Sequence, residues 1–304
     1  MKSILVGSRG SALSMAQTAL VIDSLKSHVS GRQYRIVPIK TTGDTMQEKG
    51  ETTVDSKSIF TKEIEEHLLN GEIDFAVHSM KDLTTEVPKG LVIAAVPERG
   101  NHRDAFISRN KEKFQQLPGG ARIGTSSPRR RTQLLAARAD LQIMEMRGNV
   151  DTRLRKLRSG QYDAIILAAA GLERLSLERN ITELLSTETM LPAIGQGALA
   201  VQSREDDNEI RELVSHIEHS PTRRAVAAER AFARRLGADC RTPIAAYAKT
   251  AGEKLTIEGL VASVDGRKVV RSKLVSDNHD AAKVGEELAD SLLNRGAQLV
   301  LEAQ

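Results

Sequence analysis

A lysine and an aspartate follow a short apolar run in the segment Ala76-Val77-His78-Ser79-Met80-Lys81-Asp82-Leu83. The run predicts a buried strand, and the carboxyl ends of strands are where α/β sheets present residues to ligands. Asp82 is therefore a candidate general acid or base, or a carboxylate that stabilises a developing cation. The alternative interpretation is a turn aspartate that pairs with the neighbouring Lys81.

The only cysteine, Cys240, lies in the polar segment Leu236-Gly237-Ala238-Asp239-Cys240-Arg241-Thr242-Pro243. A lone cysteine is usually a small buried hydrophobe, but a positive neighbour such as Arg241 favours the reactive thiolate. Asp239 opposes this effect. These neighbours leave a reactive thiol and a structural thiol equally well supported. One cysteine forms no internal disulfide, which favours a reducing cytosol and hence a cytoplasmic location.

Positive charge is concentrated in one segment. The 304 residues carry 44 Lys and Arg against 40 Asp and Glu, yet residues 122–158 alone hold nine Arg and one Lys against three acids. Because arginine binds carboxylate or phosphate through paired hydrogen bonds, the segment predicts a local anion site. Arg155 and Arg158 are expected to face water on a helix.

Nucleic acid is the rival partner for so basic a segment. Single-strand binders interleave their basic groove with stacking aromatic residues, and residues 122–158 contain no Phe, Tyr or Trp. Zinc-finger and basic-zipper spacings are also missing from the sequence. We therefore expect no nucleic acid partner.

Two loops share one layout, in which a strand leads through small or hydroxyl residues into a helix. They are Gly7-Ser8-Arg9-Gly10-Ser11 and Gly124-Thr125-Ser126-Ser127-Pro128-Arg129-Arg130. Helix N-termini attract anions, although one such loop alone usually only caps its helix. The dinucleotide-like pattern at residues 195–200 is rejected, because a strand and not a helix is predicted after it. His216 and His219 lack further ligands, so we expect no metal site.

The elements that position these residues alternate between strand and helix over most of the chain, which predicts an α/β fold. The alternation of strands and helices starts again after residues 97–101, so we expect two similar halves with a hinged cleft between them. The tail, with a hairpin at Val264-Asp265-Gly266 and a closing helix, predicts a small α+β domain with an antiparallel sheet. Thr41–Ser58 is polar and is predicted to be a long loop. No apolar run is long enough to span a membrane, and the apolar run after Met1 is too short for a secretion signal.

Five motifs together resemble the porphobilinogen deaminase (hydroxymethylbilane synthase) family, over nearly the whole chain. They are His78 to Asp82, Gly124 to Arg130, Arg147-Gly148-Asn149-Val150-Asp151-Thr152-Arg153, Leu191-Pro192-Ala193-Ile194-Gly195-Gln196-Gly197-Ala198, and Cys240-Arg241-Thr242-Pro243-Ile244. The resemblance implies two α/β domains like those of type II periplasmic binding proteins around a cleft, followed by a small α+β domain. The implied boundaries are residues 1–97 with 198–215, 103–191, and 220–304.

The resemblance also implies a transferase of tetrapyrrole and haem biosynthesis. Four porphobilinogen molecules are condensed head to tail, each losing ammonia, on a dipyrromethane cofactor held by a thioether to Cys240; water then releases the linear tetrapyrrole hydroxymethylbilane. The catalytic residue is Asp82, which would stabilise a cationic, azafulvene-like species at the pyrrole N–H. The implied cofactor-binding residues are Lys81, Asp82, Thr125, Ser127, Arg129, Arg130 and Arg147, and the substrate-binding residues are Arg9, Ser11, Lys57, Phe60, Arg153, Arg174 and Gln196.

The chain departs from the family pattern at three places. Asp55-Ser56-Lys57-Ser58 replaces a glycine-rich stretch, Ala238-Asp239 replaces two glycines, and Pro128 replaces a leucine. None of them removes a chemical group that the mechanism needs. A monomer is expected from the resemblance alone. Two rival hypotheses stay open on the sequence: a non-catalytic anion-binding module and a nucleic-acid binder.

Overall fold

The computed structural model describes residues 3–49, 59–237, 242–277 and 279–302. The chain divides into two compact units, each built from two stretches of sequence. The first unit joins Met1–Gly100 to Ala198–Arg223, and the second joins Asn101–Gly197 to Arg224–Gln304. Within the described residues, no helix is both long and apolar enough to cross a membrane.

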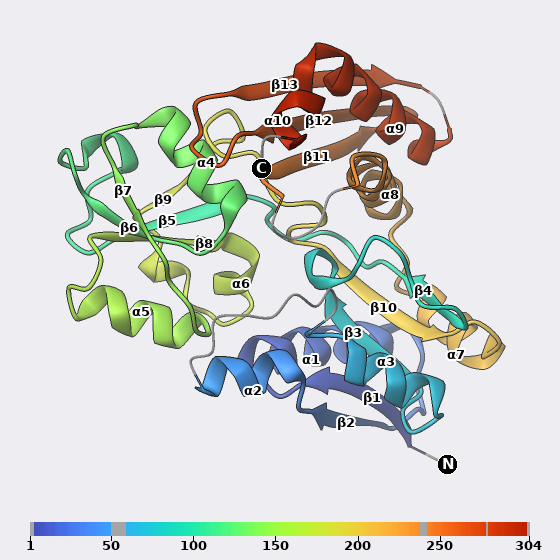
Figure 1. Ribbon diagram of the computed structural model, residues 1–304. Helices are drawn as coiled ribbons and strands as arrows, with labels where there is room; N and C mark the ends of the chain where they lie inside the picture. The colour runs from blue at the N-terminus through green and yellow to red at the C-terminus, as the bar shows by residue number, and fades with distance from the viewer. Residues whose placement is uncertain (1–2, 50–58, 238–241, 278, 303–304) are drawn as a thin grey trace. The chain divides into compact units, whose positions relative to one another are not determined.

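The first unit is built on a five-stranded mixed sheet (Figure 1). Its strand order is β2-β1-β3-β10-β4, in which β1 runs parallel to β2 and β3, whereas β10 runs antiparallel to both of its neighbours. Apolar side chains from both faces of the sheet pack against helices. The strands are β1 (Ile4–Arg9), β2 (Tyr34–Ile39), β3 (Phe75–Ser79), β4 (Leu91–Ala95) and β10 (Leu199–Arg204). The helices are α1 (Ala12–His28), α2 (Thr42–Lys49), α3 (Lys62–Leu69), α7 (Asn208–Ser215) and the short 3₁₀ turn η1 (Met80–Asp82).

The second unit holds a sheet of the same plan, with the order β7-β6-β8-β5-β9 (Figure 1). Here β6 runs parallel to β7 and β8, and the fourth strand, β5, runs antiparallel to both of its neighbours. The strands are β5 (Asp104–Ser108), β6 (Arg122–Gly124), β7 (Gln142–Met144), β8 (Ala164–Ala168) and β9 (Glu183–Leu184). The helices are α4 (Pro128–Ala137), α5 (Val150–Arg158), α6 (Ala169–Glu173) and the 3₁₀ turns η2 (Phe114–Gln116) and η3 (Glu178–Asn180).

The second unit also contains a three-stranded antiparallel sheet, in the order β11-β12-β13. A shared apolar core joins this sheet to helices α8 and α9. The two helices touch so closely that a Cβ on Gly285 would lie 2.1 Å from the Ala228 carbonyl oxygen. The elements are α8 (Ser220–Arg235, which begins in the first unit), β11 (Ile244–Ala251), β12 (Lys254–Ala262), β13 (Val269–Ser276), α9 (Ala281–Leu292), the wide turn η4 (Leu293–Ala297) and α10 (Gln298–Glu302).

This arrangement confirms the predicted fold class, an α/β fold with two mixed sheets and a small C-terminal antiparallel sheet with helices. The prediction of a loop over Thr41–Ser58 is wrong in its first half, where α2 is a helix. Sequence patterns missed α2 because its eight residues contain one apolar side chain, Met46, so no periodic face marks it. Residues 50–58 lie outside the described residues.

Candidate functional site

In the first unit, the candidate residues gather at one edge of the sheet. Strands β1 and β3 run parallel with Val6 opposite Phe75, so Arg9 and the segment Ser79–Asp82 leave the sheet on the same side. A buried Gln17 from α1 bonds the hydroxyl of Ser79, with Nε2 to Oγ 2.8 Å apart. Asp82 follows in the turn η1 and is exposed. Within the described part of the chain, no hydrogen bond or ion pair engages its carboxylate, so Asp82 is not the paired turn aspartate of the alternative interpretation.

Arg9 is held by an acid that the sequence did not single out. Its Nη2 lies 2.5 Å from Oδ1 of Asp44 in α2, and its guanidinium carbon lies 4.1 Å from the centre of the Phe60 ring. Burial would raise the pKa of Asp44, but hydrogen bonds from Arg9 and Thr41 outweigh that effect and lower it. Ser11 caps α1, as predicted, by accepting a hydrogen bond from the Ser14 amide. Three of the predicted residues, Arg9, Ser11 and Phe60, thus belong to the same unit as Asp82.

His78 is buried immediately before the Ser79–Asp82 segment. The pKa of His78 is lowered to about 4, chiefly by burial; a hydrogen bond with Gln202 offsets part of this effect, and the Arg9 cation adds to it. Above pH 6.5 the imidazole is neutral in both the folded and the unfolded chain. Between pH 6.5 and about 4, the imidazole is protonated in the unfolded chain but stays neutral in the folded chain. The free energy of unfolding therefore falls as the pH falls from 6.5 towards 4.

We expect this residue alone to lower the free energy of unfolding by about 1 kcal/mol between pH 6.5 and 5.5. His78→Gln should flatten that part of the pH dependence in denaturant melts, whereas His28→Gln, at an exposed site, should leave it unchanged. The buried Glu65 has a raised pKa and acts in the opposite direction, but it is present in all three proteins. Equal slopes for the parent chain and His78→Gln would contradict this account.

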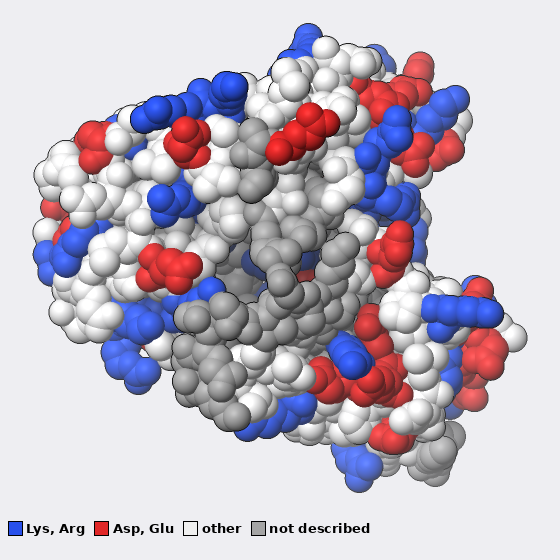
Figure 2. All heavy atoms as spheres, viewed as in Figure 1, with Lys and Arg blue, Asp and Glu red and all other residues white. Residues whose placement is uncertain are grey.

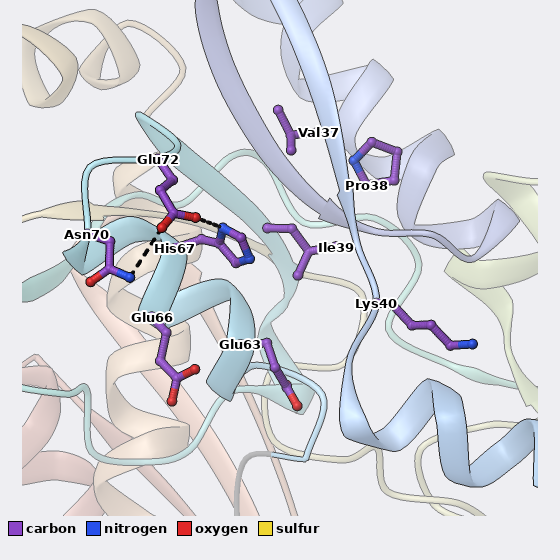
Figure 3. A pocket seen from close by; sticks show the side chains of 9 residues that line it. All are labelled: Val37, Pro38, Ile39, Lys40, Glu63, Glu66, His67, Asn70 and Glu72. Carbon is purple, nitrogen blue, oxygen red and sulfur yellow. Dashed lines mark hydrogen bonds and ion pairs between the residues drawn. The ribbon is translucent and has the colours of Figure 1, made fainter.

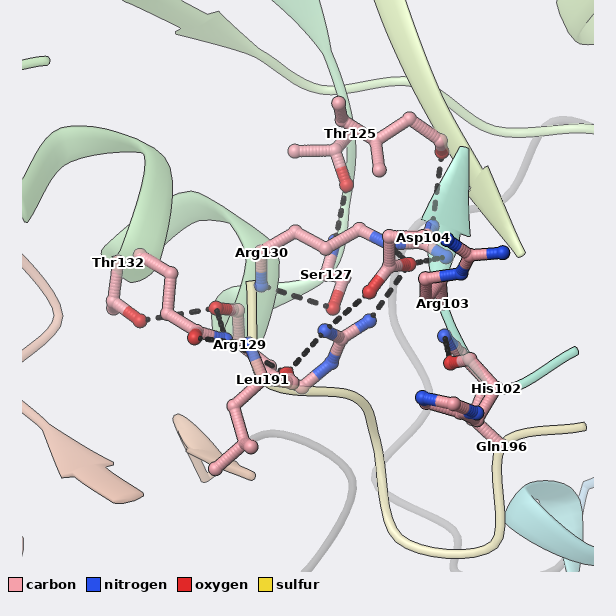
Figure 4. Close-up of polar contacts among 12 residues, drawn as sticks. His102, Arg103, Asp104, Thr125, Ser127, Arg129, Arg130, Thr132, Leu191 and Gln196 are labelled. Carbon is pink, nitrogen blue, oxygen red and sulfur yellow. Dashed lines mark hydrogen bonds and ion pairs between the residues drawn. The ribbon is translucent and has the colours of Figure 1, made fainter. Parts of the chain in front are cut away.

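In the second unit, two predicted arginines converge on one buried carboxylate (Figure 4). Arg129 and Arg130 begin α4, and Asp104 begins β5; their exposed fractions are 5%, 7% and 0%. Asp104 reaches the helix start because β5 pairs antiparallel with β8, which places Asp104 at the carboxyl end of that strand. Burial would raise the pKa of Asp104, but the two guanidiniums hold it far below its usual range.

The loop before α4 has the predicted capping layout. The Ser127 hydroxyl accepts the Arg130 amide at 3.4 Å, and the Thr125 hydroxyl accepts the Ser127 amide at 3.2 Å. Pro128 occupies the first helical position, where its missing N–H costs nothing. Thr125 and Ser127 therefore lie at the same helix N-terminus as the Asp104 cluster.

Arg153 is a cation of this unit that has no acidic partner among the described residues. It is half-buried on α5, and its one hydrogen bond in the described part of the chain goes from Nε to the Gly148 carbonyl, at 2.7 Å. The pKa of Arg153 is lowered to about 10, chiefly by burial and in part by the nearby cations Arg130 and Arg147. An anion bound here would relieve that repulsion. The expectation that Arg155 and Arg158 are exposed is confirmed.

Gln196 and Arg174 meet at the turn that precedes β10. The buried Gln196 donates from Nε2 to the His102 carbonyl at 2.8 Å, and Arg174 donates to the Gly197 carbonyl at 2.7 Å. Gly195 and Gly197 have φ of 69° and 89°, which other residues adopt only at a cost. The amide of Gly195 is held by the buried carboxylate of Glu229 at 2.7 Å. Among the predicted residues, Lys57 and Cys240 lie outside the described residues.

A pocket of about 370 Å³ between β2 and α3 is a different place in the first unit (Figure 3). Glu63, Glu66 and Glu72 line it with a single lysine, Lys40, and His67 pairs with Glu72. None of the predicted site residues lines it, and its acidic walls suit no carboxylate ligand. On the face seen in Figure 2, acidic and basic side chains are interspersed, without a continuous basic patch.

Sequence reasoning missed the two acids that hold the candidate arginines. Asp104 could have been noticed as the one charged residue of the apolar run Asp104–Ser108, since a charge in a buried strand needs a partner. Asp44 offered no such signal, because it lies in a polar segment. In the described part of the chain, no group of three or more His, Cys, Asp or Glu side chains could hold a metal ion.

Comparison with known proteins gives one consistent result. Two family models match: "Porphobilinogen deaminase, dipyromethane cofactor binding domain" over residues 4–212, and "Porphobilinogen deaminase, C-terminal domain" over residues 223–294. Proteins named porphobilinogen deaminase are 48% identical in Trichlorobacter lovleyi and 46% identical in Pelotomaculum thermopropionicum, each covering 99% of this chain and 96% of the relative. Among solved structures, a substrate-binding domain of a putative amino acid ABC transporter from Streptococcus pneumoniae aligns with a TM-score of 0.43 and 13% identity, over 78% of this chain and 95% of that one. The chain belongs to the porphobilinogen deaminase family.

Proposed function

We propose that Asp82 and the arginines of the second unit carry out the reaction of this family in this chain. The enzyme is a transferase of tetrapyrrole biosynthesis that joins four porphobilinogen molecules head to tail, each with loss of ammonia, and releases hydroxymethylbilane. Each step develops positive charge on a pyrrole. The carboxylate of Asp82, which is exposed and has no partner among the described residues, stabilises that charge at the pyrrole N–H, where a fixed opposite charge lowers the barrier most.

The cofactor of this family is a dipyrromethane, which serves as the primer that the growing chain extends. The second unit fits such a group, because Arg129 and Arg130 share a single carboxylate, Asp104, and a dipyrromethane carries several carboxylates. Arg153 adds a cation that lies near Arg130. We assign cofactor binding to Lys81, Asp82, Thr125, Ser127, Arg129, Arg130 and Arg147, and the thioether to Cys240. Substrate binding is assigned to Arg9, Ser11, Lys57, Phe60, Arg153, Arg174 and Gln196.

The same proposal covers the organisation of the chain. It has three domains, namely residues 1–97 with 198–215, 103–191, and 220–304, and it works as a monomer in the cytoplasm without a nucleic acid partner. The three sheets support the three domains, since each of them has its own apolar cluster. The single cysteine supports a reducing compartment.

The excess of buried positive charge at Arg129 and Arg130, which share the single carboxylate of Asp104, is the observation that carries the cofactor assignment. Intact-mass measurement tests it. The chain purified from cells that make porphobilinogen should be heavier than its sequence by one dipyrromethane. A mass equal to that of the bare chain, in protein that turns over porphobilinogen, would rule out the covalent cofactor.

Arg153 and Arg155, two residues apart on α5, give a matched test of the anion site. In Arg153→Leu, loss of charge-assisted hydrogen bonds should slow cofactor attachment about tenfold or more. The same change should leave the melting temperature of the cofactor-free chain equal or higher, since it removes a cation from beside Arg130 and Arg147. Arg155→Leu should change neither quantity. Mass spectrometry after addition of porphobilinogen measures the rate of attachment, and a thermal melt measures the melting temperature. If attachment slowed equally in the two variants, the basic segment would act as a diffuse positive field and not through specific contacts.

A further inference from the structure

Asp104 fixes two guanidiniums with one carboxylate (Figure 4). Its Oδ2 accepts Nη1 of Arg129 at 2.7 Å, and its Oδ1 accepts Nη2 of Arg129 at 3.2 Å. The same Oδ1 lies 2.8 Å from Nε and 2.7 Å from Nη2 of Arg130. These four contacts equal the number of acceptor sites on a carboxylate, about four, and all of them come from the two arginines.

Each guanidinium has a second, independent anchor in the backbone. Arg129 donates from Nη1 to the Leu191 carbonyl at 2.8 Å, and Arg130 donates from Nη1 to the Ile166 carbonyl at 3.0 Å. Leu191 follows β9 and Ile166 lies within β8, so the sheet and the chain beyond it both hold the arginines. Two adjacent like charges on a helix, which would otherwise repel each other, are thereby held at fixed angles.

The fixed guanidiniums retain hydrogen-bonding capacity. An arginine has five N–H donors, and the described contacts occupy three donors on each side chain. Each of the two therefore keeps two donors for which the described residues supply no acceptor. One carboxylate between two cations also leaves a positive charge on the trio, to which Arg153 adds another. The cluster is therefore incomplete without an anion.

We infer that Asp104 is a positioning residue, which holds Arg129 and Arg130 so that their remaining donors meet the carboxylates of the dipyrromethane cofactor. The inference rests on the role in cofactor binding proposed above for the two arginines. Asp104 itself touches neither cofactor nor substrate in this account. Its contribution is to fix the arginines before the anion arrives, so that little side-chain freedom is lost when it binds.

Asp104→Asn removes the charge and keeps the size. Asp163→Asn is its matched control, because Asp163 is also a carboxylate of the second unit between two arginines, Arg122 at 2.9 Å and Arg109 at 3.6 Å. Full-length chains made without porphobilinogen are mixed with it, and cofactor attachment is followed by intact mass, with circular dichroism to verify folding. Asp104→Asn should attach the cofactor about tenfold or more slowly, and Asp163→Asn within about twofold of the parent rate.

The outcomes separate the two proposals. If the parent chain gains no mass, the cofactor assignment fails. If the parent chain gains mass and folded Asp104→Asn gains it at the same rate, the positioning role is overturned while the cofactor assignment stands.

A second measurement holds even if Asp104→Asn does not fold. Nitrogen-15 spectra of arginine side chains in the unaltered chain, assigned through Arg129→Lys and Arg130→Lys, report on rotation of each guanidinium. Three-point fixation predicts separate Nη signals for Arg129 and Arg130 before cofactor attachment, and one averaged signal for the exposed Arg155. Averaged signals for Arg129 or Arg130 would overturn the inference.

Discussion

Asp82→Asn should lower kcat by about 10²–10³ with little change in KM, the loss expected when a preorganised charge is removed from a developing one. The substitution keeps the size of the side chain and removes its negative charge. Because Asp82 is exposed and makes no hydrogen bond or ion pair with other described residues, the substitution should leave the stability of the fold unchanged. Steady-state kinetics with porphobilinogen, on protein whose cofactor content is known from its mass, measure the effect.

The control is Asp206→Asn, an exposed aspartate of the same unit that lies before α7. It should leave kcat unchanged and shows that loss of one surface charge in this unit is harmless. The melting temperatures of both variants should match that of the parent chain. A normal kcat in fully loaded Asp82→Asn would remove Asp82 from the mechanism.

Cys240→Ala should abolish turnover and leave the protein at the mass of the bare chain. The proposed thioether has no other thiol to form on, because the chain contains one cysteine. Loss of the small thiol should lower the stability less than loss of the anionic cofactor that is proposed to bind the arginine cluster. The variant is therefore expected to melt at the temperature of the cofactor-free parent, below that of the loaded parent.

The informative comparison for Cys240→Ala is with a parent chain made without porphobilinogen. On addition of the substrate that chain should gain mass and activity, whereas the variant should gain neither. Turnover by Cys240→Ala would place the cofactor elsewhere or show that it need not be covalent. Cys240→Ser is a weaker test, since a hydroxyl could be modified slowly.

Local patterns predicted most of the strands and helices. Ser11 and Ser127 cap their helices as expected, because capping depends on a side chain and an amide three residues away. Arg155 and Arg158 are exposed on a helix as expected, and the structure adds that Leu154 and Leu157 form its buried side. Helix α2 was not predicted, since a short polar helix has no periodic pattern of apolar residues.

The candidate site was predictable as a set of residue types and not as a set of contacts. Arg129 and Arg130 were selected because they lie in the basic segment and in a motif of the family, but their partner Asp104 lies 25 and 26 residues away and reaches them only through the pairing of β5 with β8. The partner of Arg9, Asp44, depends likewise on where α2 packs. Long-range strand pairing is the information that local sequence patterns lack.

The place of β10 has a consequence for synthesis of the chain. This strand lies between β3 and β4, although about a hundred residues separate it from them in sequence. While the ribosome is still making residues 101–197, the first sheet lacks an inner strand, and β3 and β4 each present an unpaired edge. The sheet of the second unit has all five of its strands by residue 184 and can close first. Nascent chains that stall before residue 199 should therefore be the species most exposed to edge-to-edge aggregation and most dependent on chaperones.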